Sequence, residues 1–238
     1  YERIASLKAL LTGKKDAGEP EDAQGGKYQF VSLATDAGSW KDDVSQNSDK
    51  GTALRYALRE LNPFAVVGAD YTAHNRHGNL NLYSIENPYG MTNTYLQHRA
   101  AMLAWKNAIN TANVSYSDDF GAVNFNYTEI ISAIAAAATS PLAPLTTAVA
   151  SAISLLPADL KGDWTYEDKS GNLSFHIDGN NLTDLSNHYV RFGSDTIDEL
   201  KGGDLEDYLF GGGNIDTLDG GKGDDYMEGG QGDDTYII

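Results

Sequence analysis

Five aspartates recur at intervals of nine residues near the C-terminus, and this spacing is the strongest chemical signal in the chain. The sixth place of each nine-residue copy is always an aspartate, in the order Asp198, Asp207, Asp216, Asp225 and Asp234. The eighth place is always apolar, and glycine fills the first two places in the last four copies. A short period kept over five copies predicts a repeat architecture in which equivalent residues stack on one another.

The residue types within each copy predict a turn followed by a very short strand. Glycine at the first two places, and sometimes at the fourth, permits the positive φ angles of a tight turn. The three residues around the eighth place should form a strand with one side chain pointing inward. Two copies would then make one coil of a flattened solenoid with parallel strands. Successive turns would bring carboxylates together, and Ca²⁺ takes about six to eight such oxygen ligands.

Folding of this solenoid should depend on the cation. Only one side chain per copy points inward, so the apolar core is thin. Residues 193–238 carry thirteen acidic residues against two lysines, and folding without a cation gathers this like charge in one place. We therefore expect the segment to be disordered without calcium and ordered with it. The alternative, an acidic glycine-rich linker, is disfavoured by five copies in register.

The five copies resemble the RTX family of calcium-binding repeats. The resemblance implies that each ion lies between a turn and the turn one coil later, which makes about three ions. The implied aspartate pairs are Asp198 with Asp216, Asp207 with Asp225, and Asp216 with Asp234. Further ligands are implied among the turn residues Gly212, Asn214, Gly221, Gly223, Gly230 and Gly232. The pattern loosens in the first copy, where Ser194 and Thr196 occupy the second and fourth places, so weaker binding is expected at that edge.

The resemblance also implies a setting and a larger protein. RTX proteins leave bacteria unfolded through the one-step type I secretion channel and fold outside the cell, so a secreted, extracellular or cell-surface location is expected. Upstream, the phrases LRYALRELNPFAVVGADY, HNRHGNLNLY and YLQHRAAMLAWK resemble a segment found between a lipase-like domain and the repeats in large secreted RTX proteins. We therefore expect other domains of a longer parent chain as partners.

Composition excludes several other classes of function. The net charge is −17, and no basic stripe exists that would neutralise phosphates, so nucleic acid is not expected as a partner. The chain has no cysteine, which removes disulfides, zinc–thiolate sites and thiol catalysis.

The pattern along the chain predicts three parts: a mainly helical α+β domain over 1–159, a β-hairpin adaptor over 160–192, and a calcium-binding parallel β-roll over 193–238. Strand 189–192 should run directly into the first repeat, so that the adaptor sheet covers the open end of the roll. The other predicted elements are helices over 1–12, 52–61 and 92–110, a strand or helical turn over 28–33, a polar loop over 42–49, a strand over 80–83, and a hairpin of 164–166 with 173–177.

Residues 130–158 carry no charge. Pro141 and Pro144 divide this run, so two packed helices are favoured over a membrane span, which needs about 20 apolar residues. Membrane contact stays open as the less favoured alternative.

Enzymatic chemistry has little support in the residues. A Gly-x-Ser-x-Gly nucleophile motif is absent. The alternative hypothesis is that this chain contributes a lid or a catalytic histidine to a lipase-like hydrolase, with His74, His77 and His98 as candidates. Surface or packing roles are favoured for all three. A third, weaker hypothesis is adhesion through exposed aromatics. Its candidates are Tyr71, Tyr83 and Tyr89. Acidic residues near the adaptor, including Glu167 and Asp168, are interpreted as a solvated face rather than a further calcium site.

Overall fold

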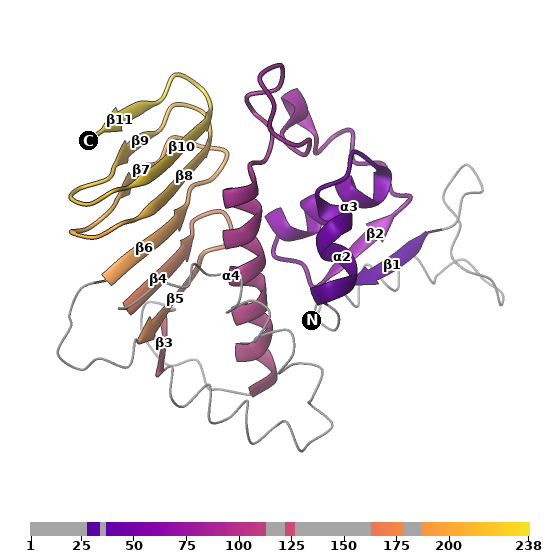
Figure 1. Cartoon of the computed structure of the whole chain (residues 1–238), viewed down its shortest axis with the longest axis horizontal. Helices are drawn as coiled ribbons and strands as arrows, with labels where there is room; N and C mark the ends of the chain where they lie inside the picture. The colour runs from indigo at the N-terminus through magenta and orange to yellow at the C-terminus, as the bar shows by residue number, and fades with distance from the viewer. Residues whose placement is uncertain (1–27, 34–36, 113–121, 127–162, 179–186) are drawn as a thin grey trace.

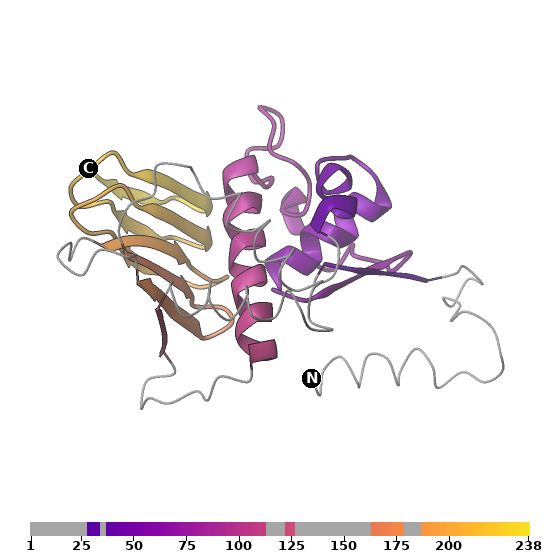
Figure 2. The same cartoon turned by 60° about the horizontal axis from the view of Figure 1, so that its bottom comes forward.

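The computed structural model describes residues 28–33, 37–112, 122–126, 163–178 and 187–238. In these parts the chain forms three layers, and the long helix α4 (Asn93–Ala112) is the middle one (Figures 1 and 2). A small unit of helices and strands lies on one side of α4, and the strands of the C-terminal region lie on the other. The fold is therefore mixed α+β, and one helix contacts both halves.

The small unit is organised around helix α3 (Asp49–Arg59). Ser48 caps its first turn, because the Ser48 hydroxyl accepts a hydrogen bond from the backbone N–H of Gly51 at 3.1 Å. Leu54 and Leu58 on the same face are fully buried. The remaining elements of the unit are α2 (Ala37–Val44), the antiparallel pair β1 (Gln29–Ser32) and β2 (Phe64–Val67), and the 3-10 turn η1 (Arg76–Gly78).

Helix α4 begins where its sequence predicts. The Thr92 hydroxyl accepts a hydrogen bond from the Tyr95 backbone N–H at 3.1 Å, which caps the first turn. The helix predictions over 52–61 and 92–110 are thus confirmed by α3 and α4. Within the described part of the chain, no helix is long and apolar enough to cross a membrane. The predictions over 1–12 and 130–158 lie outside the described residues.

Two predictions for the first half are wrong. The polar stretch 42–49 is not all loop, because α2 continues to Val44, whose buried side chain joins Trp40 on an apolar helix face. The stretch 80–83 is not a strand. Leu82 makes only an isolated bridge with Met91, since the chain folds back on itself in a series of turns there.

In the described residues from Ala122 onward, nine strands form two sheets. The six-stranded sheet has the order β10-β8-β6-β4-β5-β3, and the three-stranded sheet has the order β11-β9-β7. The strands of the first sheet are β3 (Ala122–Asn126), β4 (Asp163–Asp168), β5 (Leu173–Asp178), β6 (Asn187–Phe192), β8 (Tyr208–Gly213) and β10 (Tyr226–Gln231). Those of the second are β7 (Glu199–Lys201), β9 (Thr217–Asp219) and β11 (Thr235–Ile237). The antiparallel pair of β4 and β5 confirms the predicted hairpin, and β6 confirms the strand that leads into the repeats.

Residues 193–238, here called the coil stack, wind between the two sheets. Even-numbered copies supply β8 and β10, and odd-numbered copies supply β7, β9 and β11. All pairs are parallel and one coil apart, as in Tyr208 with Tyr226 and Leu200 with Leu218. Parallel strands with this regular register are compatible with a β-roll. Strand β6 continues the same register, because Val190 pairs with Tyr208.

The core of the coil stack is as thin as the sequence predicts. Leu200, Leu209 and Leu218 are buried in a cluster of their own, and Met227 packs partly against them. The last copy departs from the pattern, because Tyr236 at its eighth place is 48% exposed.

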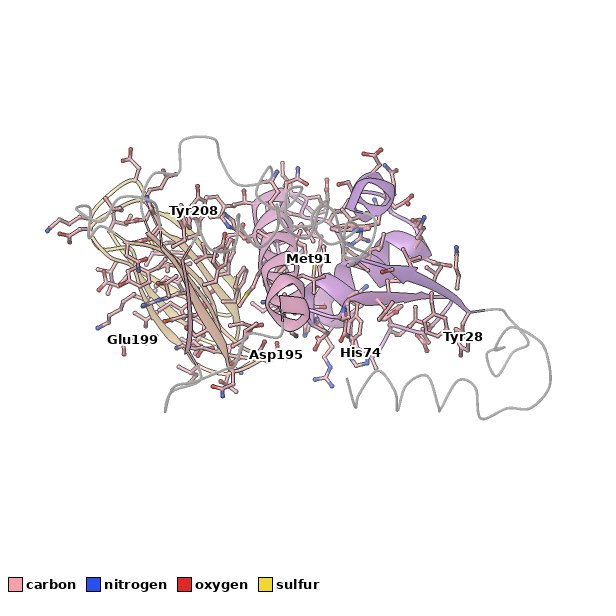
Figure 3. The ribbon with its side chains drawn as sticks, turned by 90° about the horizontal axis from the view of Figure 1, so that it is seen from below. Tyr28, His74, Met91, Asp195, Glu199 and Tyr208 are labelled. Carbon is pink, nitrogen blue, oxygen red and sulfur yellow. The ribbon has the colours of Figure 1, made fainter. Side chains whose placement is uncertain are left out.

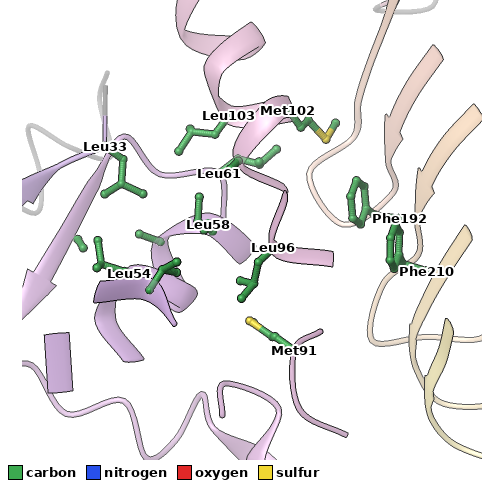
Figure 4. Close-up of a cluster of buried hydrophobic side chains, with 14 of the residues drawn as sticks. Leu33, Leu54, Leu58, Leu61, Met91, Leu96, Met102, Leu103, Phe192 and Phe210 are labelled. Atoms are coloured by element: carbon green, nitrogen blue, oxygen red, sulfur yellow. The ribbon is translucent and has the colours of Figure 1, made fainter. Parts of the chain in front are cut away.

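The outer face of the six-stranded sheet is covered by α4, which the repeat pattern does not predict. Tyr95 of α4 contacts Phe192 and Phe210 edge-on, at ring-centroid distances of 5.6 and 5.4 Å. Phe192 and Phe210 themselves stack at 4.9 Å. Figure 4 shows the resulting apolar cluster, which runs from α3 through α4 to the strands. Figure 3 shows Tyr208 near α4 and Glu199 on the far side of the strands.

A buried ion pair ties the three layers together. Arg99 of α4 contacts Asp168 at 2.9 Å, and their side chains are only 2% and 3% exposed. Arg99 also donates to the Leu58 carbonyl at 3.2 Å and to the Arg59 carbonyl, both in α3. The prediction that Asp168 belongs to a solvated acidic face is therefore wrong, because this carboxylate is the buried partner of an arginine.

The turns of the coil stack explain where glycine is needed. Positive φ occurs at the second place, as in Gly221 (92°), and at the fourth, as in Gly223 (116°). Glycine is required at the first place for a steric reason and not for the predicted positive φ. A Cβ on Gly211 would lie 2.6 Å from Oδ2 of Asp216, so the carboxylate leaves no room for a side chain.

Removal of the buried arginine should destabilise the whole chain. Arg99→Met leaves Asp168 buried and unpaired, and we expect the free energy of unfolding in calcium to fall by about 3–5 kcal/mol. Lys50→Met is the control, since its half-exposed pair with Asp43 contributes about 0–1 kcal/mol. Urea unfolding followed by tryptophan fluorescence measures both. Equal losses for the two variants would contradict the structural role of Arg99.

Substitution of a turn glycine should separate strained from unstrained positions. Gly221→Ala forces positive φ on alanine and places its Cβ 2.2 Å from the Gly203 carbonyl oxygen, so we expect a loss of about 1–3 kcal/mol. Gly213→Ala is the matched control, because its Cβ would lie 3.5 Å from its nearest neighbour at an ordinary φ. Urea unfolding followed by circular dichroism in calcium compares them. A control as damaging as Gly221→Ala would refute this view of the turns.

Candidate calcium site

The sixth-place aspartates form two rows along the coil stack. Asp198, Asp216 and Asp234 make the odd row, and Asp207 and Asp225 make the even row. In each row an Oδ1 atom accepts a hydrogen bond from the backbone N–H of the aspartate one coil earlier. These bonds are Asp198 to Asp216 at 2.8 Å, Asp207 to Asp225 at 3.0 Å, and Asp216 to Asp234 at 2.9 Å. The structure thus brings together all three aspartate pairs that the resemblance to RTX repeats implies.

The hydrogen-bond partners of the second carboxylate oxygen, Oδ2, differ along the rows. Oδ2 of Asp198 accepts hydrogen bonds from the Ser194 backbone N–H and hydroxyl, at 2.7 and 2.9 Å. Oδ2 of Asp207 accepts one from the Gly203 N–H at 2.5 Å. Oδ2 of Asp216 is buried and has no hydrogen-bond partner. A buried carboxylate oxygen without a partner is costly, and a cation beside it would remove that cost.

The pKa values of the aspartates in the rows also favour a bound cation. Burial, together with the neighbouring carboxylates of Asp234 and Asp198, raises the pKa of Asp216 to about 6, against the lowering effect of the hydrogen bond from the Asp198 backbone. Burial also raises the pKa of Asp207 and of Asp225. Ionisation of these three aspartates is therefore unfavourable by itself, which is the condition that a bound divalent cation reverses. The pKa of Asp198 is lowered instead, because hydrogen bonds from Ser194 and Lys169 outweigh the effect of its burial.

The turn carbonyl oxygens lie close to the glycines of the next coil. A Cβ on Gly212, Gly221 or Gly230 would lie 2.2–2.4 Å from the carbonyl oxygen of the residue one coil earlier. A Cβ on Gly223 would lie 2.6 Å from the Leu205 carbonyl oxygen, and one on Gly232 would lie 1.8 Å from the Asn214 carbonyl oxygen. The positive φ at all of these glycines lets successive turns stack at this distance.

Asn214 takes the place of a fourth-position glycine. It adopts a φ of 76°, and its side-chain Nδ2 donates to the Asp195 carbonyl at 3.0 Å. Asparagine tolerates this left-handed conformation better than most residues do. Its side chain thus holds two successive turns together.

This donor set fits calcium. It consists of carboxylate and carbonyl oxygens, which hard cations such as Ca²⁺ prefer. In the described parts of the chain, no three carboxylate or imidazole side chains converge on one point. An aspartate pair would therefore share its ion with turn carbonyls.

The candidate histidines occupy packing or turn positions. His98 is 5% exposed and packs on Tyr208 at a ring-centroid distance of 4.2 Å, and burial lowers its pKa to about 4. It is a neutral packing residue, out of reach of a substrate. His74 packs on Tyr56 at 4.8 Å, and His77 lies in the turn η1 with a φ of 54°.

Of the aromatic residues considered for adhesion, Tyr83 and Tyr89 are exposed. Tyr71 instead donates its hydroxyl to the Val66 carbonyl at 2.7 Å and packs against the core.

Sequence reasoning missed two features of the site's surroundings. The first is the aromatic residue at the seventh place of the even copies, Tyr208 and Tyr226, which packs toward α4. The sequence does show this difference between even and odd copies, because the odd copies carry Glu199, Thr217 and Thr235 at the seventh place. The second is Lys169, whose Nζ lies 3.2 Å from Oδ1 of Asp198. No spacing pattern connects these two residues.

Comparison with known proteins agrees with the geometry. Residues 201–236 match the family model of the RTX calcium-binding nonapeptide repeat over four copies. This range holds the aspartates from Asp207 to Asp234 and omits the first copy, where the pattern is loosest. No curated protein and no solved structure matched the chain significantly. The C-terminal part of the chain therefore consists of RTX calcium-binding nonapeptide repeats, and Ca²⁺ is the ion that such repeats bind.

Proposed function

We propose that residues 193–238 form a parallel β-roll whose folding is driven by extracellular calcium and whose ions are structural. One observation carries this proposal: Asp216 has a buried carboxylate oxygen without a partner, in a row with two other carboxylates. Such a row is stable only when its charge is neutralised. The calcium-binding repeats that the chain contains name the ion that does so.

The ligands follow from the stacking of the turns. Each aspartate pair, one coil apart, shares an ion: Asp198 with Asp216, Asp207 with Asp225, and Asp216 with Asp234. Carbonyl oxygens of the glycine turns complete each site. Asp216 belongs to two of the three sites, so it is the residue on which the array depends most.

The chain's own residues prepare the sites but do not hold the roll together. Backbone N–H groups fix the direction of each carboxylate, as Asp198 does for Asp216 at 2.8 Å. The internal core offers little cohesion, because its cluster of buried apolar residues in the described structure consists of Leu200, Leu209 and Leu218. Bound calcium supplies the missing attraction between coils by neutralising the carboxylates.

Ordering of the roll also completes the surface on which α4 packs. Phe210 and Tyr226 face α4 from β8 and β10, which pair with each other coil to coil. In addition, the Thr92 hydroxyl at the start of α4 donates to Glu228 of β10 at 2.5 Å. Calcium binding in the roll therefore favours the docking of α4, and the switch extends beyond the repeats.

The biological setting follows from the affinity expected of such sites. Extracellular calcium modules have Kd values of about 0.1–1 mM, so the roll would stay unfolded in a cytosol and fold outside the cell. This suits a protein secreted through a type I channel. Within it, residues 1–159 and the adaptor over 160–192 would connect the roll to other domains of a longer chain. The described residues contain no observation that favours a hydrolase role.

Calcium should induce β structure in the intact chain. Titration after chelation should give a cooperative gain of β signal by circular dichroism, with a midpoint of about 0.1–1 mM. Magnesium should have little effect, because it demands a small octahedral shell and keeps its waters. Equal protease resistance of the chelated and calcium-loaded chain would rule out the proposed switch.

Substitution of the shared aspartate should impair calcium binding most. Asp216→Asn should raise the calcium midpoint by about tenfold or more, because the lost charged contacts exceed about 1.5 kcal/mol. Asp233→Asn removes the same charge from an exposed position in the last copy and should shift the midpoint far less. The same titration compares the two variants, and a similar shift in both would show that only net charge matters.

A further inference from the structure

Among the strands that the structure describes, the first coil of the roll has an open edge on its odd side. Strand β7 is the last strand of the three-stranded sheet, and its only described strand neighbour is β9. On the even side the edge is closed by β6, whose Tyr189 N–H donates to Oδ1 of Asp207 at 2.7 Å. Asp207 thus accepts a backbone hydrogen bond from a preceding strand. Asp216, Asp225 and Asp234 accept the same kind of hydrogen bond from the preceding coils.

Asp198, the first aspartate of the odd row, receives its donor from another source. Nζ of Lys169 lies 3.2 Å from Oδ1 of Asp198 and donates to the Glu199 carbonyl at 2.9 Å. Oδ1 is the oxygen that, in the later aspartates, accepts a backbone N–H from one coil earlier. The ammonium therefore occupies the position of a preceding coil.

The lysine is held in this position by the protein core. Its backbone N–H donates to the Phe192 carbonyl at 2.9 Å, at the end of β6. The preceding residue, Asp168, fixes the hairpin turn by accepting from Ser170 at 2.6 Å, and Asp168 is itself paired with buried Arg99. The Lys169 ammonium is thus positioned by a turn that these hydrogen bonds fix.

Burial separates this contact from an ordinary surface pair. Asp198 is only 8% exposed, although Lys169 is 41% exposed. On the same edge strand, Lys201 contacts Glu199 at 2.8 Å, but both of these side chains are more than half exposed. A buried carboxylate depends on its partner for orientation, whereas an exposed pair contributes little.

We propose that Lys169 caps the first coil of the roll and positions its first calcium ligand. Its ammonium gives Asp198 and the β7 edge the donors that a preceding coil would give, and so it holds the Asp198 carboxylate toward the ion shared with Asp216. This inference rests on the proposed calcium sites. It assigns a role in calcium binding to a residue outside the repeats.

The test is calcium titration by calorimetry on the intact chain. It compares the wild type with Lys169→Met, Lys169→Arg, Asp198→Ala and the double variant Lys169→Met/Asp198→Ala. Lys201→Met is the matched control, because it removes an exposed lysine of the same edge strand. Circular dichroism of every variant in chelator reports whether the metal-free chain has changed.

Lys169→Met should weaken the first ion about threefold or more, as expected for directly coupled residues. Lys169→Arg should restore most of the affinity, and Lys201→Met should leave it unchanged. In the Asp198→Ala background, Lys169→Met should have no further effect. The chelated spectrum should stay the same in all variants.

Three results would overturn the proposal. They are unchanged or tighter calcium binding in Lys169→Met, additive effects in the double variant, and a loss of structure by Lys169→Met already in chelator, which would mean that the lysine serves the fold alone. Absence of any calcium response in the wild type would instead refute the proposed function itself, so the two failures are distinguishable.

Discussion

The structure depends on one constraint, which is that carboxylates must stack in rows at hydrogen-bonding distance from the coil before them. The register of one coil per two copies sets this spacing. The buried oxygen of Asp216 and its raised pKa are the local expression of this constraint. A repeat of this kind places carboxylates next to one another, so they repel each other in the folded state. The stability of that state therefore depends on the cations in the surrounding solution.

The coil stack has two unlike faces, and this difference joins it to the rest of the chain. The six-stranded sheet carries aromatic residues such as Tyr208 and Phe210 toward α4, whereas the three-stranded sheet presents Glu199 and Lys201 to solvent. The repeats are therefore more than an appended metal-binding tail. They provide one wall of the core that α3 and α4 also line, and the Arg99–Asp168 pair fixes the strands next to that wall.

The sequence predicts the local features of the site well. The nine-residue period is enough to predict the turns, the short strands and the buried leucines, because each depends on neighbours at a fixed spacing. The three aspartate pairs come from the resemblance to RTX repeats. The cap at Thr92 and the strand before the first repeat also follow from local patterns. Contacts between distant segments do not. The burial of Asp168, the packing of His98 on Tyr208 and the approach of Lys169 to Asp198 arise only when α4 and the hairpin meet the repeats. The seventh-place aromatics are an intermediate case, since their alternation is visible in the sequence but its meaning requires knowledge of which face is covered.

The uniform register of the coils has an evolutionary consequence. Each new coil pairs with the one before it across the same 18 positions, as Tyr226 with Tyr208 and Tyr208 with Val190. The chain entropy lost on closing each loop is therefore the same for every coil and does not grow with the length of the array. Duplication or deletion of whole coils leaves the remaining ones with the same neighbours and the same closure cost. Repeat number is thus a quantity that genomes can change in single steps while the architecture is preserved.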